Sequence, residues 1–158
     1  MRRWRWALLT AVIAAGVGVG AGFLGAFLGD GLLQAPVLDP QVVAEGKFLY
    51  QENCATDCHG GMGEGQLGWE VPNPNGARGA PPHNSTGHTW MHSDLELYRA
   101  VRDGLPADER TGADSEMLPF RDELSPEQIR AVITYLKSLW TDGQRAYQAR
   151  ESIEHPFR

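Results

Sequence analysis

Residues 52–60 read ENCATDCHG, which places two cysteines and a histidine within a few positions of one another. Cys54 and Cys58 enclose three residues, and His59 follows the second cysteine directly. A disulfide is one interpretation, because a three-residue gap in an oxidising compartment permits it. Zinc binding with His59 fits no common ligand spacing. A redox-active cysteine pair would need a βαβ context that this sequence lacks.

Covalent attachment of a c-type haem explains the same residues better. The usual pattern is C-x-x-C-H, in which two thiols add across the two vinyl groups and the adjacent imidazole reaches the iron. Cys58 and His59 keep that adjacency, so only the reach from Cys54 to Cys58 changes. Because Cys54 is expected at the end of a helix and can shift, we expect a wider turn. A single thioether through Cys58 is the alternative.

The N-terminal residues predict a membrane anchor. Residues 6–29 carry no charge, and at ~1.5 Å per residue a helix of that length exceeds the ~30 Å hydrocarbon layer. Three arginines within the first five positions should stay in the cytoplasm. We therefore expect a cytoplasmic start and transmembrane signal-anchor over residues 1–33 and a linker over 34–41. A cleaved signal peptide is the alternative, and either leader delivers the remainder to the outer, periplasmic side of the inner (cytoplasmic) membrane.

The net charge restricts the kinds of macromolecule that the protein is expected to bind. The net charge is −6, and without the three N-terminal arginines 11 basic residues face 20 acidic ones. Nucleic-acid binding needs a basic face that neutralises phosphates, so no nucleic-acid partner is expected. An acidic surface suits a protein with a positively charged docking patch, toward which it would be steered.

Helical periodicity and capping signals predict an all-α domain with long connections. Ser or Asp caps and early Pro residues mark the helix starts, and apolar residues recur at helical spacing. The expected helices cover residues 40–54, 93–103, 126–140 and about 142–152. The connections over 60–88 and 105–123 are unusually long for a compact domain. A large apolar cofactor would supply the core that these loops lack.

Met117 is the candidate for a second iron ligand. A haem-iron site in an electron carrier usually has two axial ligands, and a methionine raises the reduction potential. Met117 lies in the irregular stretch EMLPF just before the last well-capped helix, where Pro119 would stiffen the loop. Met62 is too close to His59 to cross the haem, and Met91 lies among histidines. The alternative is that Met117 merely fills the core.

Together these features resemble a class I cytochrome c. The order is a first helix with Gly46 and Tyr50, then N-C-x(3)-C-H-G, a Gly/Pro-rich loop, a short helix, a Met-x-x-Phe loop and the helix LSPEQIRAVITYLKSLW. More narrowly, the chain is similar to membrane-anchored bacterial monohaem cytochromes c with EGQ, APPH and GHTW motifs, which begin here at residues 64, 80 and 87.

The resemblance covers about residues 42–150 and implies a helical fold packed around one haem. It implies one covalent haem c linked through Cys54 and Cys58, with His59 and Met117 as the two axial ligands of the iron. The expected cytochrome c domain spans residues 42–140, and residues 141–158 would form a polar C-terminal helix or tail.

Two departures from the family pattern concern the site. The extra residue between Cys54 and Cys58 affects the geometry of the thioethers. Family members usually have Met-Pro where this chain has Met117 and Leu118, so the ligand loop is expected to be looser. Neither departure removes a donor atom.

The resemblance implies a membrane-tethered carrier of single electrons between respiratory or photosynthetic redox partners, and not an enzyme in itself. The partners would be a quinol-oxidising complex, a dehydrogenase or a terminal oxidase. The alternative functions are a haem-based gas sensor, if Met117 is displaceable, and a copper-handling module for oxidase assembly.

The copper alternative comes from three histidines, His83, His88 and His92, with Met91 beside the last. Imidazole and thioether groups together suit copper. One of these histidines could also replace Met117 as the distal haem ligand. Otherwise they would be structural residues or form hydrogen bonds at the haem edge.

Overall fold

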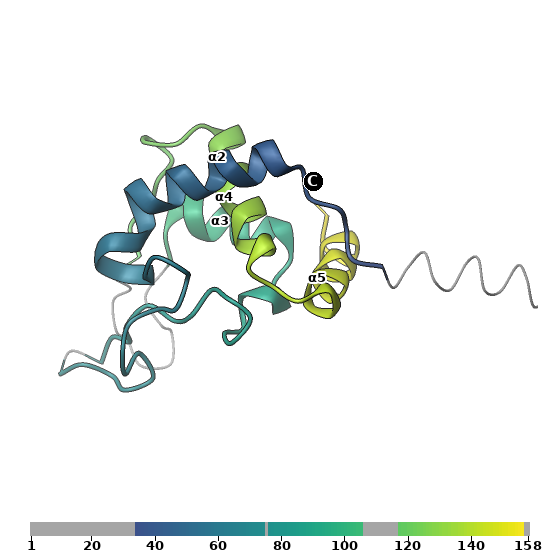
Figure 1. Cartoon of the computed structure of the whole chain (residues 1–158). Coiled ribbons are helices and arrows are strands. Elements are labelled where there is room, and N and C mark those ends of the chain that lie inside the picture. Colours follow the sequence, from purple (N-terminus) through teal and green to yellow (C-terminus); the bar gives the residue numbers. More distant parts are fainter. Residues whose placement is uncertain (1–33, 75, 106–116, 157–158) are drawn as a thin grey trace, which may run out of the picture. The chain divides into compact units, whose positions relative to one another are not determined.

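The computed structural model describes residues 34–74, 76–105 and 117–156, and these residues form helices and no strand (Figure 1). This agrees with the predicted helical fold. In chain order the elements are α2 (Pro40–Tyr50), the π-helix η1 (Gln51–His59), the 3₁₀ turn η2 (Thr89–Met91), α3 (Asp94–Asp103), α4 (Pro126–Ser138) and α5 (Asp142–Glu154). Among the described residues no helix is long and apolar enough to cross a membrane, and the predicted span over residues 6–29 lies outside them.

The α-helices begin where the sequence predicted, because a side chain satisfies the first backbone N–H groups. The Asp39 carboxylate accepts from the amide of Gln41 at 2.8 Å. Helices α3, α4 and α5 each start with a reciprocal capping box, in which Ser93, Ser125 and Thr141 are the N-caps. Each such cap stabilises its helix by about 1 kcal/mol.

The core forms where α2 crosses α4. A Cβ atom at Gly46 would lie 1.9 Å from the Ala131 carbonyl oxygen, so only glycine allows the two backbones this close. The rings of Tyr50 and Tyr135 pack beside the crossing, with centroids 5.1 Å apart. Helix α4 supplies more of the buried apolar side chains than any other described element, and these are Ile129, Ala131, Val132, Ile133, Tyr135 and Leu136. Each fully buried Ile, Val or Leu contributes about 1.5–3 kcal/mol.

Trp140 lies just beyond the end of α4, and the predicted helix was therefore two residues too long. The indole still belongs to the buried core, and its Nε1 donates to the His83 carbonyl at 2.8 Å. The end of α4 is in this way fixed to the loop that precedes η2.

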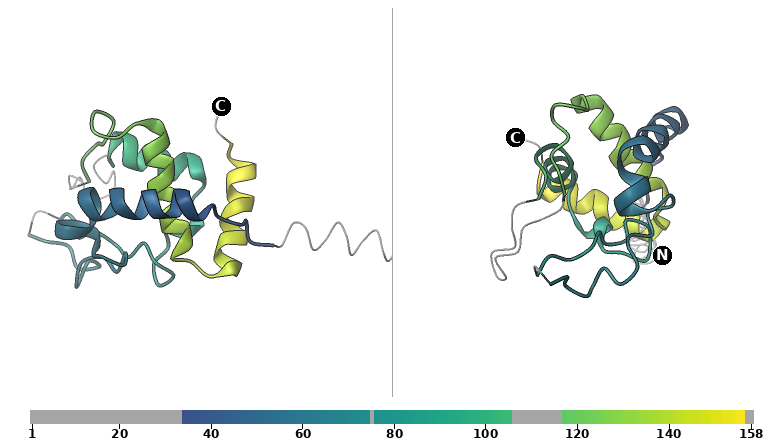
Figure 2. Two further views of the ribbon diagram at one scale, coloured as in Figure 1. Left: turned by 45° about the horizontal axis from the view of Figure 1, so that its top comes forward. Right: turned by 90° about the vertical axis from the view of Figure 1, so that its left-hand side faces the viewer.

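Helix α5 packs against the start of α3 through polar contacts (Figure 2). Gln148 is 1% exposed, and its amide donates to the His92 carbonyl and to the Asp94 carboxylate at 3.2 and 2.7 Å. The same carboxylate pairs with Lys137 of α4 at 2.6 Å. Buried polar groups of this kind are stable because each one is hydrogen-bonded.

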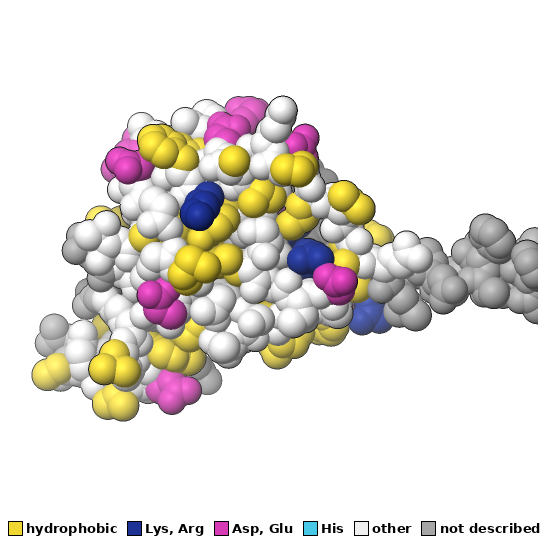
Figure 3. Space-filling model, viewed as in Figure 1, with side chains coloured by type: hydrophobic (Ala, Val, Ile, Leu, Met, Phe, Trp, Pro, Cys, Tyr) yellow, Lys and Arg dark blue, Asp and Glu magenta, His cyan; other side chains and the backbone are white. Residues whose placement is uncertain are grey.

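The face that carries α2 shows no concentration of one charge. Figure 3 shows Lys and Arg side chains only at separated points on this face, with Asp and Glu side chains scattered between hydrophobic ones. Asp103, the last residue of α3, pairs with Arg121 of the following turn at 3.2 Å.

Candidate functional site

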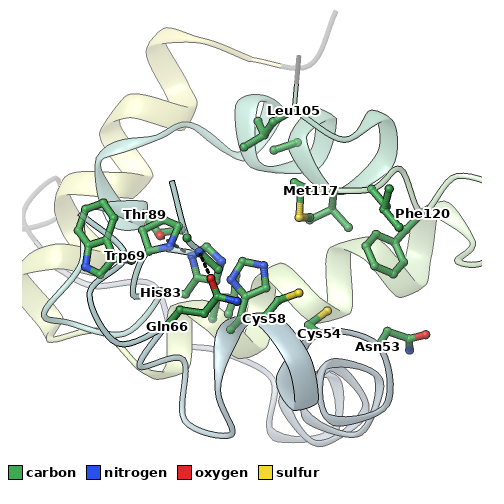
Figure 4. Close-up of a pocket in the computed structure, with 18 of the residues that line it drawn as sticks. Asn53, Cys54, Cys58, Gln66, Trp69, His83, Thr89, Leu105, Met117 and Phe120 are labelled. Atoms are coloured by element: carbon green, nitrogen blue, oxygen red, sulfur yellow. Dashed lines mark hydrogen bonds between the residues drawn. The ribbon is translucent and has the colours of Figure 1, made fainter. Parts of the chain in front are cut away.

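A cavity of about 530 Å³ lies between η1, the loops that follow it, and helices α3 and α4 (Figure 4). All four residues predicted for the site line it: Cys54, Cys58, His59 and Met117. The apolar part of the wall is formed by Leu97, Val101, Leu105, Phe120, Ile133 and Leu136. The volume falls within the ~300–1,000 Å³ typical of ligand pockets.

The cysteine motif adopts a nine-residue π-helix, which explains how the chain accommodates its extra residue. A π-helix closes i→i+5 hydrogen bonds and so holds about one more residue per turn than an α-helix. The amide of Gly60, for example, donates to the Ala55 carbonyl at 3.0 Å. The predicted wider turn is therefore present, and both Cys54 and Cys58 border the same cavity.

The two cysteines are thiols and are not joined to each other. The disulfide interpretation is therefore not what the structure shows. Burial, and then the proximity of Cys58, raises the pKa of the Cys54 thiol to about 11. Cys54 is thus held as an uncharged thiol, while Cys58 is exposed.

His59 ends the π-helix and is 8% exposed. Its Nδ1 is buried without a hydrogen-bond partner among the described residues. Burial lowers the pKa of the ring, and the nearby Pro81 carbonyl opposes this effect. A buried, neutral imidazole offers an unprotonated nitrogen, which is the form that binds a metal.

Several side chains fix the backbone directly after the motif. The Tyr50 hydroxyl lies within hydrogen-bond distance of the His59 and Gly60 carbonyls, at 3.2 and 3.0 Å. The Gln51 amide donates to the Gly61 carbonyl at 2.7 Å. Because these bonds come from the last turn of α2 and the first residue of η1, the helix that precedes the motif also orients its histidine.

The EGQ and APPH motifs meet next to His59. The amide of Gln66 donates to the Ala80 carbonyl, and the Ala80 amide donates back to the Gln66 side chain, both at 2.9 Å. Gly65, which directly precedes Gln66, has a φ of 74°, and a Cβ there would lie 2.7 Å from the Ala80 oxygen. The amide of Gly65 also donates to the His59 carbonyl at 2.9 Å. These motifs therefore form one wall of the cavity.

His83 packs directly against His59, with ring centroids 4.2 Å apart. Its Nδ1 lies 2.7 Å from the Thr89 hydroxyl, which itself donates to the Pro82 carbonyl. Burial, and then the proximity of His59, lowers the pKa of His83 to about 3, so this ring is neutral. Two imidazoles in contact cannot approach one iron from opposite faces, which argues against His83 as a distal ligand.

Met117 lies on the opposite side of the cavity from the two cysteines in Figure 4. Its carbonyl accepts from the amide of Leu105 at 3.4 Å, just beyond Gly104, which ends α3. The predicted connection over residues 105–123 is described only in part, since 106–116 lie outside the described residues. In the described part, Leu118 is 70% exposed, and the amide of Phe120 donates to the Val101 carbonyl at 3.1 Å.

The other large polar and aromatic side chains near the site divide between the cavity and its surroundings. Trp69 and Arg78 line the cavity, and the Arg78 guanidinium donates to the Glu70 carbonyl. His88 stacks on Trp69, with centroids 6.3 Å apart, and does not line the cavity. His92 lies next to His88. Of the three histidines, only His83 lines the cavity.

Two thiols, a buried imidazole and a thioether sulfur thus surround one largely apolar cavity. This donor set fits a large flat iron porphyrin, since imidazole and thioether are established axial donors and the thiols can form thioethers. Sequence reasoning missed the contact between His83 and His59. The APPH motif itself was the available signal, but its position relative to the haem motif depends on long-range packing.

Comparison with known proteins gives a consistent result. A family model described as Cytochrome c matches residues 43–140. A cbb3-type cytochrome c oxidase subunit FixP of Sinorhizobium medicae is 29% identical over 109 residues, which is 68% of this chain and 34% of the relative. The FixP subunit of Azorhizobium caulinodans is 30% identical over 96 residues, covering 61% and 29% of the two chains.

The match to these relatives spans about a third of their own length. A FixP subunit of Rhizobium meliloti is similar to the same extent, at 28% identity over 109 residues. No solved structure matches the chain significantly.

Proposed function

This chain belongs to the cytochrome c family, and from that premise we propose that it is a membrane-tethered carrier of single electrons. Its cofactor is one covalently bound haem c, which supplies an iron couple that gains and loses one electron. The observation that carries the proposal is the meeting of all four predicted donor residues around one cavity.

The cysteines would attach the cofactor from the π-helix. Each thiol would add across a vinyl group of the haem, with its sulfur bonded to one vinyl carbon and its hydrogen transferred to the other. Both thiols border the cavity despite the three-residue gap, which favours two thioethers over one. The uncharged state of Cys54 suits an addition in which the thiol supplies both sulfur and hydrogen.

His59 and Met117 would be the axial ligands. His59 is held by the backbone bonds that follow the π-helix, and Met117 lines the same cavity from the loop after α3, across from the two cysteines (Figure 4). If both axial positions were occupied by these residues, no open coordination site would remain for a substrate, as expected of an electron carrier. Buried apolar side chains of α3 and α4 exclude water, and a methionine ligand favours a higher reduction potential.

Membrane tethering rests on the uncharged run of residues 6–29 and the arginines before it. The tether would hold the haem domain at the outer face of the inner membrane. The similarity to FixP subunits of cbb3-type oxidases makes a terminal oxidase the preferred electron acceptor. A quinol-oxidising complex or a dehydrogenase would be the donor.

Intact mass of the protein purified from membranes tests attachment and tethering together. We expect the full chain plus one haem, with no free thiol left for alkylation. A haem-free mass would contradict the attachment, and loss of the leader would contradict the tether alone.

An optical spectrum of the reduced protein with and without CO separates electron transfer from gas sensing. We expect low-spin bands that CO does not change. A readily formed CO adduct would instead support the sensor. Reoxidation of the reduced protein by a purified cbb3-type oxidase then tests the acceptor, and failure of that step alone would leave the electron-carrier function standing.

A further inference from the structure

His88 and His92 lie at the two ends of the 3₁₀ turn η2, outside the haem cavity. Their ring centroids are 5.6 Å apart, and the ring planes are inclined by 66°. His88 is exposed to solvent, and the His92 side chain is 46% exposed, so an ion can reach both rings. We propose that this imidazole pair binds one divalent transition-metal ion, with Cu²⁺ as the preferred ion.

The separation of the rings suits a shared ion. With nitrogen–metal bonds of ~2.0–2.1 Å, two imidazoles on one ion have centroids about 4.5–6.5 Å apart. The observed 5.6 Å falls in that range, so the two rings have the spacing of a pair that shares one ion. The backbone between the rings is fixed, since the Met91 amide donates to the His88 carbonyl at 2.9 Å and Ser93 caps α3.

The surrounding charges favour a cation. A carboxylate oxygen of Glu96 lies 3.9 Å from Nδ1 of His92, and the same oxygen accepts from the amide and hydroxyl of Ser93, which hold it in place. His88 itself stacks on the Trp69 ring.

Cu²⁺ is preferred because it binds nitrogen sites more strongly than the other first-row divalent ions. One competing cluster exists among the described residues, formed by Glu151, Glu154 and His155 near the end of α5. It is largely exposed and contains a single imidazole, so we expect it to bind Cu²⁺ more weakly. This competitor also provides a matched control.

The test is equilibrium dialysis of the oxidised, haem-loaded full chain against Cu²⁺, with EPR of the bound ion. Haem loading matters because it consumes the two thiols, which would otherwise bind copper. We expect one tightly bound Cu²⁺ whose spectrum shows nitrogen hyperfine structure. His88→Gln and His92→Gln should each weaken binding tenfold or more, while His155→Gln should leave it unchanged.

Three results would overturn the proposal: full-strength binding in the doubly substituted His88→Gln, His92→Gln chain, loss of binding in His155→Gln, or no nitrogen hyperfine structure. The haem spectrum of each variant shows whether it has folded. Because neither histidine lines the haem cavity, an unchanged haem spectrum with lost copper binding separates this site from the proposed electron-transfer function.

Discussion

The two sides of the cavity are built differently. On the side of His59, side chains from α2 and backbone groups from the following loop converge on one carbonyl, which accepts from both Tyr50 and Gly65. On the side of Met117, the loop meets the end of α3 through backbone bonds from Leu105 to Met117 and from Phe120 to Val101. The side of His59 is therefore held by bonds from several segments, whereas the backbone bonds on the side of Met117 join one loop to the end of one helix.

The difference suggests a test of which proposed ligand is fixed and which is adjustable. A residue held by many segments keeps its position when one contact is lost, because the remaining contacts still define it. Among the described residues, backbone bonds on the side of Met117 join the loop to the end of α3, and a segment joined to one element opens at lower free energy. We therefore expect changes near Met117 to alter the reduction potential and changes near His59 to alter attachment and stability.

We expect the largest effect from substitutions that prevent covalent attachment of the haem. Cys58→Ser removes the thiol adjacent to His59, and covalent haem should fall to near zero. Cys54→Ser should retain one thioether, because the Cys58–His59 pair is intact. Mass spectrometry of both variants measures the difference. Equal haem loss in the two variants would contradict the view that the second cysteine and its neighbouring histidine form the essential unit.

We expect the second largest effect from removal of Met117, the proposed sulfur ligand. Met117→Ala should open one axial position, lower the reduction potential and allow CO to bind, while the haem stays attached. Redox titration and a CO difference spectrum measure these changes. Met62→Ala is the matched control, since Met62 is 61% exposed and does not line the cavity. An unchanged low-spin spectrum in Met117→Ala would mean that another residue is the distal ligand.

The pH dependence of folding stability tests the environment of His83, which packs against His59. Its folded pKa of about 3 lies below the ordinary value of 6.5, so the unfolded chain binds the proton more tightly. The stability that comes from keeping His83 neutral is complete above pH 6.5 and is lost as the pH falls toward 3. Over that range the free energy of unfolding should decrease by up to ~1.4 kcal/mol per pH unit.

Urea unfolding between pH 7 and pH 4 measures that slope. His83→Phe should flatten it, because phenylalanine keeps a ring against His59 but does not titrate. His155→Gln, which removes an exposed imidazole, should leave the slope as it is. Parallel slopes for the native chain and His83→Phe would show that folding does not lower the pKa of His83.

The sequence predicted the features whose causes are local. The caps at Asp39, Ser93 and Ser125 are confirmed, and so is the end of α3 at Gly104, since a cap acts within one helical turn. The spacing of Cys54 and Cys58 indicated a wider turn, which is the π-helix. The family and its haem are confirmed by the match over residues 43–140.

Features that depend on distant segments could not be predicted. Gln148 reads as a solvent-facing residue of a polar helix, yet it is buried because its partners come from the start of α3. The packing of His83 on His59 requires the EGQ and APPH loops to pair, and no periodicity encodes that pairing. The roles of His59 and Met117 as ligands remain predictions, as do the domain limits.

A smaller effect is expected at the loop that carries Met117. Gly104 has a φ of 73°, and a Cβ there would lie 2.7 Å from the Met117 carbonyl oxygen. Gly104→Ala should therefore destabilise the fold by about 1–2 kcal/mol and weaken the iron–sulfur charge-transfer band. Gly143→Ala is the control, because nothing lies within 4 Å of its added Cβ and the residue is helical. A fully retained band in Gly104→Ala would show that the loop is held from elsewhere.

The smallest expected effect concerns the network around His59. Tyr50→Phe removes a hydroxyl bonded to the His59 and Gly60 carbonyls, both of which keep other donors, from Gly65 and Gly63. No acceptor is left unsatisfied, so the cost should be only about 1 kcal/mol. The Tyr135 hydroxyl lies 3.5 Å from the Gly61 carbonyl, which makes a weaker hydrogen bond. Tyr135→Phe should therefore reduce stability even less than Tyr50→Phe. If Tyr50→Phe instead shifts the reduction potential as far as Met117→Ala does, the imidazole side is as adjustable as the sulfur side, and the contrast between the two sides fails.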